Sequence, residues 1–239
     1  MLQTSNAIIL SSVRYSDTRA IVHAYTRERG SVSYNIPVPT SRRKSKYKVM
    51  FFPLALVEIT ADYRPNKEVQ HVQEVRLLRA ISTPSANPIS NAISIFLLEF
   101  WDKLLRSEVK DYRLFDFIQY SLYEFEKATG ADLSSFHIKH LCSLTMVLGI
   151  SPHHETFRQG YVLDVQEGIF RPSSYSATQA PLQESNIIYH YLTSPEEYRP
   201  ALNREIRNSI LSLLLRYYEH HYPSISSMKS PKVLSVLFG

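Results

Sequence analysis

The sequence has little glycine and almost no cysteine, and these shortages exclude several classes of protein. Six glycines in 239 residues argue against a glycine-rich nucleotide loop, and neither GxGxxG nor GxxxxGK[ST] occurs. Chemistry driven by a bound nucleotide is therefore not expected. The single cysteine, Cys142, cannot form an internal disulfide, which fits a reducing compartment.

Long hydrophobic runs are absent as well. No window approaches 18 apolar residues, and the opening "MLQTSNAIIL" has no basic segment followed by a long apolar core. We therefore expect a soluble protein of the cytoplasm. The hydrophobic share of 44% predicts a globular chain rather than a disordered one.

The usual patterns of metal ligands and catalytic nucleophiles are also missing. Neither HExxH nor GxSxG occurs, although there are nine histidines. His137 and His140 share one face of a predicted helix, and residues 153–155 read "HHE" in a predicted loop. We expect ordinary surface or capping histidines, no metal and no cofactor. A hydrolase that uses the histidine-rich loop is the corresponding alternative.

Positive charge is present, and it is concentrated in the N-terminal third. Residues 1–80 hold thirteen Lys and Arg against six Asp and Glu, whereas residues 81–239 hold fourteen against sixteen. Such segregation indicates an anionic partner, of which nucleic acid is the commonest. The alternative is a solvated basic face without a specific partner.

The same third has the pattern of a β-domain. Apolar and polar residues alternate, β-branched and aromatic residues are frequent, and turn residues separate the runs. The pattern predicts five strands, at residues 7–15, 18–27, 31–38, 52–64 and 68–80. Five short antiparallel strands fit a small closed barrel, either an OB-fold or an SH3-like barrel. Gly30 suits a turn that needs a positive φ.

The remaining residues are mainly helical in pattern. "STPSANP" (82–88) reads as a linker, so we expect one domain at residues 1–81 and a second at 82–239. Asn87 is a predicted N-cap with Pro88 at the first helical position. Further helices are predicted at about 111–129, 133–148, 203–221 and 229–237. Residues 150–182 are irregular, except for a hairpin with Glu167 and Gly168 at its turn.

The stretch "PTSRRKSKYK" (39–48) places five positive charges in a predicted loop between the third and fourth strands. The predicted phosphate contacts are Arg42, Arg43, Lys44, Lys46 and Lys48, which would position a strand without reading its sequence. Tyr34 and Tyr47 are candidates for stacking on bases, although packing in the sheet is the stronger reading for any single tyrosine. Further candidates at strand ends and turns are Arg14, Arg19, Arg27, Arg29, Arg64 and Lys67.

Several motifs together, in this order, resemble the bacterial RecO family of DNA repair and recombination mediators. They are the opening "AIILSSVRYSDTRAIVHAYTRERGSVSY", the basic loop, "FPLALVEI", "VQEVRLL", "FLLEFWDKLL", "LFDFI" and the terminal "MKSPKVLSVLF". The resemblance spans nearly the whole chain, and each motif alone is only moderately specific.

The resemblance implies an N-terminal OB-fold followed by a helical domain. It also implies binding of single- and double-stranded DNA and annealing of complementary strands. The implied protein partners are RecR, often the single-stranded DNA-binding protein SSB through its acidic tail, and indirectly the recombinase RecA. Residues 150–182 depart from many relatives because they contain no cysteine, so the four-cysteine zinc site of those relatives cannot form here.

Two functions remain from this reading besides the hydrolase. The first is a non-catalytic mediator that binds DNA in the cytoplasm at the nucleoid. The second is an adaptor whose basic barrel binds an acidic protein instead of DNA.

Overall fold

The computed structural model describes residues 2–38, 50–81, 87–106, 108–174 and 176–237. The chain forms two compact units. The barrel unit comprises Met1–Ser85 and Ser94–Glu126, and the helical unit comprises Ala86–Ile93 and Lys127–Gly239. These units follow spatial contacts, whereas the predicted boundary after residue 81 follows composition, so that boundary stays a prediction.

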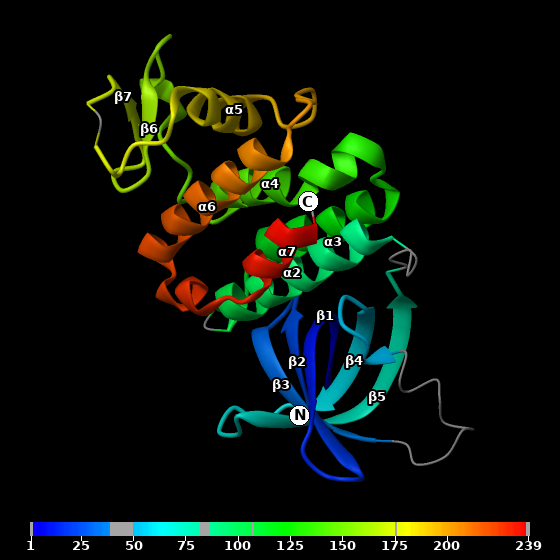
Figure 1. The fold of residues 1–239 in the computed structure, drawn as a ribbon. Helices are drawn as coiled ribbons and strands as arrows, with labels where there is room; N and C mark the ends of the chain where they lie inside the picture. The colour runs from blue at the N-terminus through cyan, green and yellow to red at the C-terminus, as the bar shows by residue number, and fades with distance from the viewer. Residues whose placement is uncertain (1, 39–49, 82–86, 107, 175, 238–239) are drawn as a thin grey trace. The chain divides into compact units, whose positions relative to one another are not determined.

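Five strands form a closed barrel in the barrel unit (Figure 1). They are β1 (Leu2–Arg14), β2 (Arg19–Thr26), β3 (Gly30–Pro37), β4 (Leu56–Asp62) and β5 (Val69–Arg79). Their order is β1-β2-β3-β5-β4, and β3 and β5 run parallel whereas the other pairs are antiparallel. This five-stranded barrel confirms the predicted OB-fold class.

Alternation along the strands fills the barrel. Val32, Tyr34 and Ile36 of β3 point inward and belong to its core, while the residues between them are half-buried. In β1 the alternation gives way to a continuous buried run from Ala7 to Leu10. Ala7 and Ile9 join the barrel core, so Ile8 and Leu10 are buried on the outer face.

Two helices complete the barrel unit: α2 (Pro88–Leu105), of which the part from Ser94 belongs here, and α3 (Tyr112–Lys127). Tyr25 of β2 connects the barrel to them. Its ring stacks on Phe115 at 6.4 Å between centroids, and its hydroxyl donates to the Val109 carbonyl at 3.2 Å. Burial raises the pKa of Tyr25 to about 12. The tyrosine therefore acts as a neutral hydrogen-bond donor on the outer face of the barrel.

Gly30 allows the chain between α2 and α3 to lie directly on the β2–β3 turn. Its φ is 71°, and a Cβ at this position would lie 2.6 Å from the Glu108 carbonyl oxygen. The adjacent Ser31 N–H donates to that same oxygen at 3.2 Å. The predicted turn role of Gly30 is confirmed, and the close backbone contact is an additional reason for glycine.

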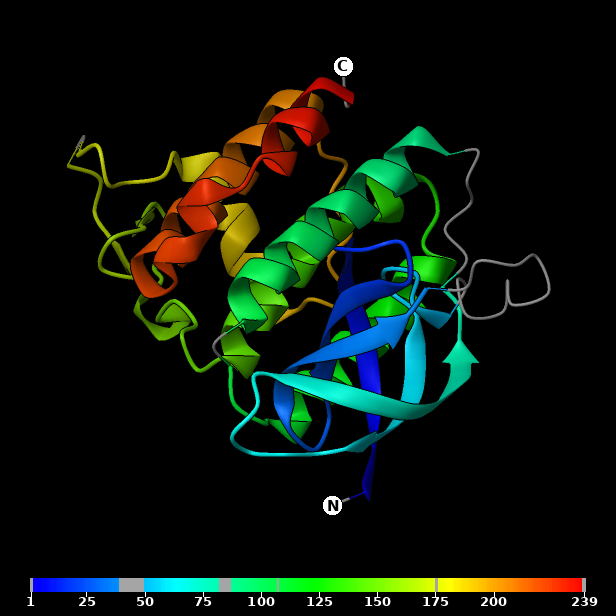
Figure 2. The same ribbon diagram turned by 90° about the horizontal axis from the view of Figure 1, so that it is seen from below.

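The helical unit contains α4 (Gly130–Val147), α5 (Leu182–Thr193), α6 (Arg204–His221) and α7 (Ser230–Leu237), with the 3₁₀ turns η2 (His154–Thr156) and η3 (Pro223–Ser227) (Figures 1 and 2). Tyr218 of α6 donates to the Leu141 carbonyl at 2.7 Å, and Tyr217 donates to the Ile150 carbonyl at 2.5 Å. These bonds join α6 to α4 and to the segment after it. Within the described residues, none of the helices has the length and apolar content required to cross a bilayer.

A small hairpin is attached to the helical unit, as predicted. Its strands β6 (Val162–Asp164) and β7 (Ile169–Arg171) pair antiparallel around a turn that includes Gly168, with φ 67°. The hairpin lies beside α5 in Figure 1.

The buried carboxylate of Asp164 organises this hairpin. It accepts hydrogen bonds from the Gln166 and Glu167 N–H groups at 3.0 and 3.2 Å and from the Thr178 hydroxyl at 2.9 Å, and it pairs with Arg171. Burial of the charge raises the pKa of Asp164, but the donors outweigh it, so the pKa lies below its ordinary value. One side chain thus connects β6, β7 and the loop at residue 178.

Candidate nucleic-acid interface

Most of the predicted phosphate contacts lie outside the described residues. These are Arg42, Arg43, Lys44, Lys46 and Lys48, together with Tyr47, which all fall in residues 39–49. The flanks of this segment are described, and they show where it leaves and rejoins the barrel. The Val38 N–H donates to the Thr18 carbonyl at 2.8 Å, and the Leu54 N–H donates to the Ile9 carbonyl at 2.8 Å. Both flanks are therefore tied to β1 or to the turn after it.

Arg14 and Arg19 lie at the end of the barrel from which this segment departs. Arg19 begins β2 and pairs with Pro37, the last residue of β3. Arg14 ends β1, donates to the carbonyls of Ser16 and Asp17 at 3.0 and 2.7 Å, and pairs with the Asp17 carboxylate at 3.5 Å. Both arginines are exposed. We call this end, with residues 14–19 and Val38, the loop end of the barrel.

Arg27 and Arg29 lie at the opposite end, because the β2–β3 turn is at the far end of both strands. Arg27 forms a bidentate pair with Asp116 of α3 at 2.9 and 3.0 Å and lies 4.9 Å from the Tyr112 ring centre. This hydrogen-bonded pair holds the pKa of Asp116 below its ordinary value. The charge of Arg27 is therefore already matched within the protein.

Arg29 and Arg64 are engaged in a similar way. Arg29 stacks on Tyr63 at 3.9 Å from the ring centre, and its Nε donates to Gln3 at 2.9 Å. Arg64 pairs with Asp62 at 2.8 Å. Lys67 is exposed in the same β4–β5 turn, and its carbonyl accepts from the Gln70 amide at 2.6 Å.

The structure therefore separates residues that the sequence analysis grouped together. Arg14 and Arg19 share the loop end, whereas Arg27, Arg29, Arg64 and Lys67 belong to the other end. The predicted contacts at that second end stay predictions, although three of its arginines already have partners within the barrel unit.

Tyr34 requires a correction. Its side chain is only 4% exposed and belongs to the barrel core, and burial raises its pKa well above the ordinary value. A base cannot stack on a ring enclosed by the barrel, so the proposed stacking role of Tyr34 is wrong. The packing role that the sequence analysis preferred for any single tyrosine applies to it.

Phe52 is an exposed aromatic that the sequence analysis missed, because it assigned residues 52–64 to a strand. The strand β4 begins only at Leu56. Before it, the Ala55 N–H donates to the Phe52 carbonyl at 3.0 Å, which closes a turn with Pro53 at its second position. Phe52 itself is 68% exposed. Pro53 was the feature of the sequence from which this turn could have been predicted.

The third position of this turn is strained. Leu54 has φ 67°, which is a genuine outlier for a bulky residue and costs about 1–2 kcal/mol relative to a right-handed conformation. A turn with proline second and a positive φ third is of type II, in which glycine is usual. The leucine side chain is 3% exposed, so its burial offsets the backbone cost.

The predicted surface or capping role of the helix α4 histidines is also corrected. His137 and His140 are 1% and 3% exposed, and burial lowers the pKa of each to about 3. They are neutral core residues. In the described part of the chain, no three His, Cys, Asp or Glu side chains are grouped closely enough to hold a metal ion.

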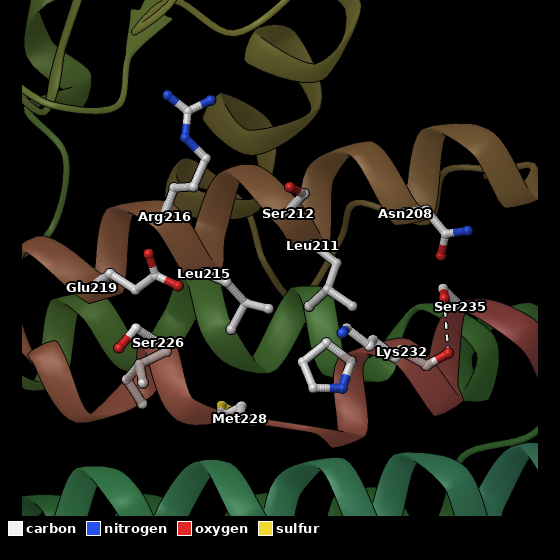
Figure 3. Close-up of a pocket in the computed structure, with 12 residues that line it drawn as sticks. Asn208, Leu211, Ser212, Leu215, Arg216, Glu219, Ser226, Met228, Lys232 and Ser235 are labelled. Carbon is white, nitrogen blue, oxygen red and sulfur yellow. Dashed lines mark hydrogen bonds between the residues drawn. The ribbon is translucent and has the colours of Figure 1, made fainter.

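A groove in the helical unit is lined by α6, η3 and α7 (Figure 3). Its apolar lining includes Leu211, Leu215, Ile225 and Met228. Figure 3 shows the two leucines pointing from α6 into the groove, with Lys232 extending across it.

The charged residues at the groove differ in direction. Arg216 turns away and donates to the Ala177 carbonyl at 3.0 Å, whereas Glu219 stays at the α6 side of the groove (Figure 3). Lys232 is therefore the cation that the groove itself presents.

Comparison with known proteins identifies the family of the chain. A family model described as "Recombination protein O N terminal" matches residues 1–81. The chain is 31% identical to the DNA repair protein RecO of Phocaeicola vulgatus and 30% identical to those of Bacteroides fragilis and Porphyromonas gingivalis, over the full length of both chains in each pair. The chain belongs to the RecO family of DNA repair proteins.

Proposed function

We propose that this chain is a non-catalytic mediator that binds single- and double-stranded DNA, anneals complementary strands and helps RecR to load RecA. The observation that carries the DNA-binding part is the arrangement of charge on the barrel. Arg14 and Arg19 are exposed at the end from which a segment with five positive charges departs. Arg14 pairs with Asp17 at 3.5 Å, and the arginines at the other end pair with Asp116, Tyr63 and Asp62, so the loop end is distinguished by the charge of the segment that departs from it.

Physical chemistry connects this arrangement to annealing. Cations that neutralise phosphates release condensed counterions, so binding is strong at low salt and independent of sequence. Two complementary strands repel each other through their phosphates, and a shared cationic surface reduces that repulsion. Such a surface needs neither a cofactor nor a catalytic residue.

The test is a DNA-binding and annealing titration at several salt concentrations. The variant carries Arg42→Gln, Arg43→Gln, Lys44→Gln and Lys46→Gln. We expect weaker binding and annealing, and a salt slope shallower by up to about 3, since each lost single-strand phosphate contact removes about 0.7. The matched control removes four charges outside the barrel, by Arg113→Gln, Lys127→Gln, Arg158→Gln and Lys229→Gln.

Two results would contradict the proposal. Equal losses in both variants would show that net charge alone governs binding and that the loop has no special role. Absence of DNA binding by the wild-type protein, together with capture of RecR, would favour the adaptor whose barrel binds an acidic protein.

For SSB, we propose the groove of α6, η3 and α7 as the binding site of its acidic tail. The resemblance to the family implies a tail that ends in phenylalanine, which the apolar lining suits, and Lys232 suits the carboxylates of the tail. Glu219 disfavours acidic residues at its own end of the groove. Lys232→Glu should abolish capture of a tail peptide while Glu219→Gln strengthens it, and unchanged capture by both variants would place the tail elsewhere.

A further inference from the structure

Phe52 is the most unusual exposed side chain of the barrel unit. It is 68% exposed, more than the exposed tyrosines Tyr15, Tyr112 and Tyr120. A phenylalanine ring has no polar atom that could form a hydrogen bond with water, so its exposure does not stabilise the folded state. Aromatic residues, phenylalanine included, are enriched at contact surfaces relative to the rest of a protein surface.

The backbone around Phe52 keeps the ring at the surface. Phe51 before it is 6% exposed and belongs to the barrel core, and Leu54 after it is 3% exposed. The Leu54 N–H donates to Ile9, and the Ile9 N–H donates to Ala55 at 3.0 Å. The ring cannot turn inward unless one of its buried neighbours moves out. Because this backbone is already ordered, a contact made by the ring needs little further ordering of the main chain.

Phe52 is connected to the loop end of the barrel in two ways, through the sequence and along strand β1. In sequence it follows Lys48, the last cation of the basic segment, by four residues. In space its turn is bonded to Ile9 of β1, and the same strand continues for about 16 Å to Arg14 at 3.3 Å per residue. Beyond Arg14 lie the exposed Tyr15 and Arg19.

We infer that Phe52 stacks on an unpaired base of single-stranded DNA whose phosphates are held by Arg14 and Arg19. This inference rests on the proposed function and specifies it. Every base has a π-face, so stacking is independent of sequence, as phosphate contacts are. In a duplex those faces are covered by neighbouring bases. Phe52 therefore favours single-stranded over double-stranded DNA.

The test compares Phe52→Ala, Phe52→Leu and Phe52→Tyr in the full-length chain. Affinity for a single-stranded oligothymidine should fall about 5-fold to 100-fold for the alanine and leucine variants and stay within about 2-fold of wild type for tyrosine. Affinity for a duplex should not change. The salt slope should also be unchanged, because no phosphate contact is lost. Tyr120→Ala, an exposed aromatic on α3, is the matched control and should bind normally.

A fluorescent variant gives a direct readout. Trp101, the single tryptophan, is fully buried, so Phe52→Trp adds an exposed indole whose emission is read against the wild-type background. Emission should be quenched by oligothymidine and not by duplex.

Each contrary result has a distinct meaning. Normal single-strand affinity in Phe52→Ala, with a loss in the loop variant above, overturns this inference and leaves the proposed function intact. Wild-type affinity in Phe52→Leu shows that the site needs an apolar rather than an aromatic side chain, which also overturns it. Normal DNA binding with loss of RecR capture assigns Phe52 to a protein interface instead.

Discussion

At the scale of single residues, the charge states of the buried polar side chains affect the stability of this chain. Asp164, His137 and His140 are all buried, but they differ in charge. Asp164 stays ionised because donors surround it, whereas the two histidines stay neutral because burial disfavours their protonated forms. Both cases give stability effects that can be measured.

Removal of the Asp164 charge should loosen the hairpin. Asp164→Asn cannot pair with Arg171 and leaves donors unsatisfied, so we expect a loss of about 2–4 kcal/mol in the free energy of unfolding. Urea unfolding measures the loss, and hydrogen exchange should locate it at residues 162–180. Glu167→Gln, at an exposed position of the same turn, is the control and should change stability by less than about 0.5 kcal/mol. Equal stability of Asp164→Asn would contradict the role given to this carboxylate.

The histidines predict a pH dependence of stability. Their pKa falls from the ordinary 6.5 to about 3 in the folded chain, so below pH 6.5 the unfolded chain binds more protons. The stability they contribute is present above pH 6.5 and is lost as pH falls towards 3, at about 1.4 kcal/mol per pH unit for each histidine. Urea midpoints between pH 7.5 and 4.5 check this slope. His140→Phe should make it shallower, because it removes one of the two buried imidazoles.

At the scale of elements, the β2–β3 turn and the α2–α3 connection depend on each other. Backbone atoms of Glu108, Val109 and Lys110 lie directly against Gly30 at this contact. A side chain at residue 30 would separate the two segments and disturb the Tyr25 hydrogen bond to Val109.

Gly30→Ala should therefore be strongly destabilising. The added Cβ would lie 2.6 Å from backbone atoms, and the alanine would have to adopt a positive φ. We therefore expect a loss of at least about 2–3 kcal/mol in the free energy of unfolding. Gly160→Ala also has a positive φ but nothing within 4 Å, so it isolates the cost of φ alone. Thermal unfolding of both variants measures the difference, and equal losses would show that the close contact is unimportant.

The sequence predicted which helices and strands form better than it predicted the residues at which they begin and end. The Asn87 cap of α2 was predicted and is present, with the Asn87 side chain accepting from the Ile89 and Ser90 N–H groups at 3.0 and 3.3 Å. Helix α5 was not predicted, because it is only 12 residues long and follows the irregular segment. The early start predicted for β4 hid Phe52, since alternation cannot distinguish a strand from a tight turn that continues into it.

The candidate site was only partly predictable for a related reason. Composition locates the positive charge in the first 80 residues, but tertiary contacts decide which charges are available. Nothing in the local sequence of Arg27 indicates Asp116, which is far along the chain. Likewise, Tyr34 and Tyr15 are both tyrosines near basic residues, and only the barrel closure separates the buried one from the exposed one.

At the scale of the whole molecule, this RecO chain maintains its fold without the cysteines of a zinc site. Hydrogen bonds and an ion pair of Asp164 hold the hairpin together, and the single Cys142 is buried, which raises its thiol pKa. The stability of the chain should therefore respond to neither metal supply nor redox state.

Chelation tests this directly. Incubation with EDTA, with or without a thiol reductant, should leave the unfolding temperature within about 1 °C of the untreated protein, because the described side chains form no group of three metal ligands. A protein with a structural zinc site is the positive control and should lose stability. A shift in this chain would reveal a metal site that its described side chains do not form.

The buried run of β1 also has a consequence for biosynthesis. Ile8 and Leu10 leave the ribosome first, but β4 pairs with β1 only after residue 62, and Phe115 covers Tyr25 later still. At about 5–20 residues per second, this hydrophobic strand waits roughly 5–20 s for its partners. We therefore expect this strand to be accessible to chaperones that bind at the ribosome exit, and we expect slow translation of the first half to reduce the yield of folded protein.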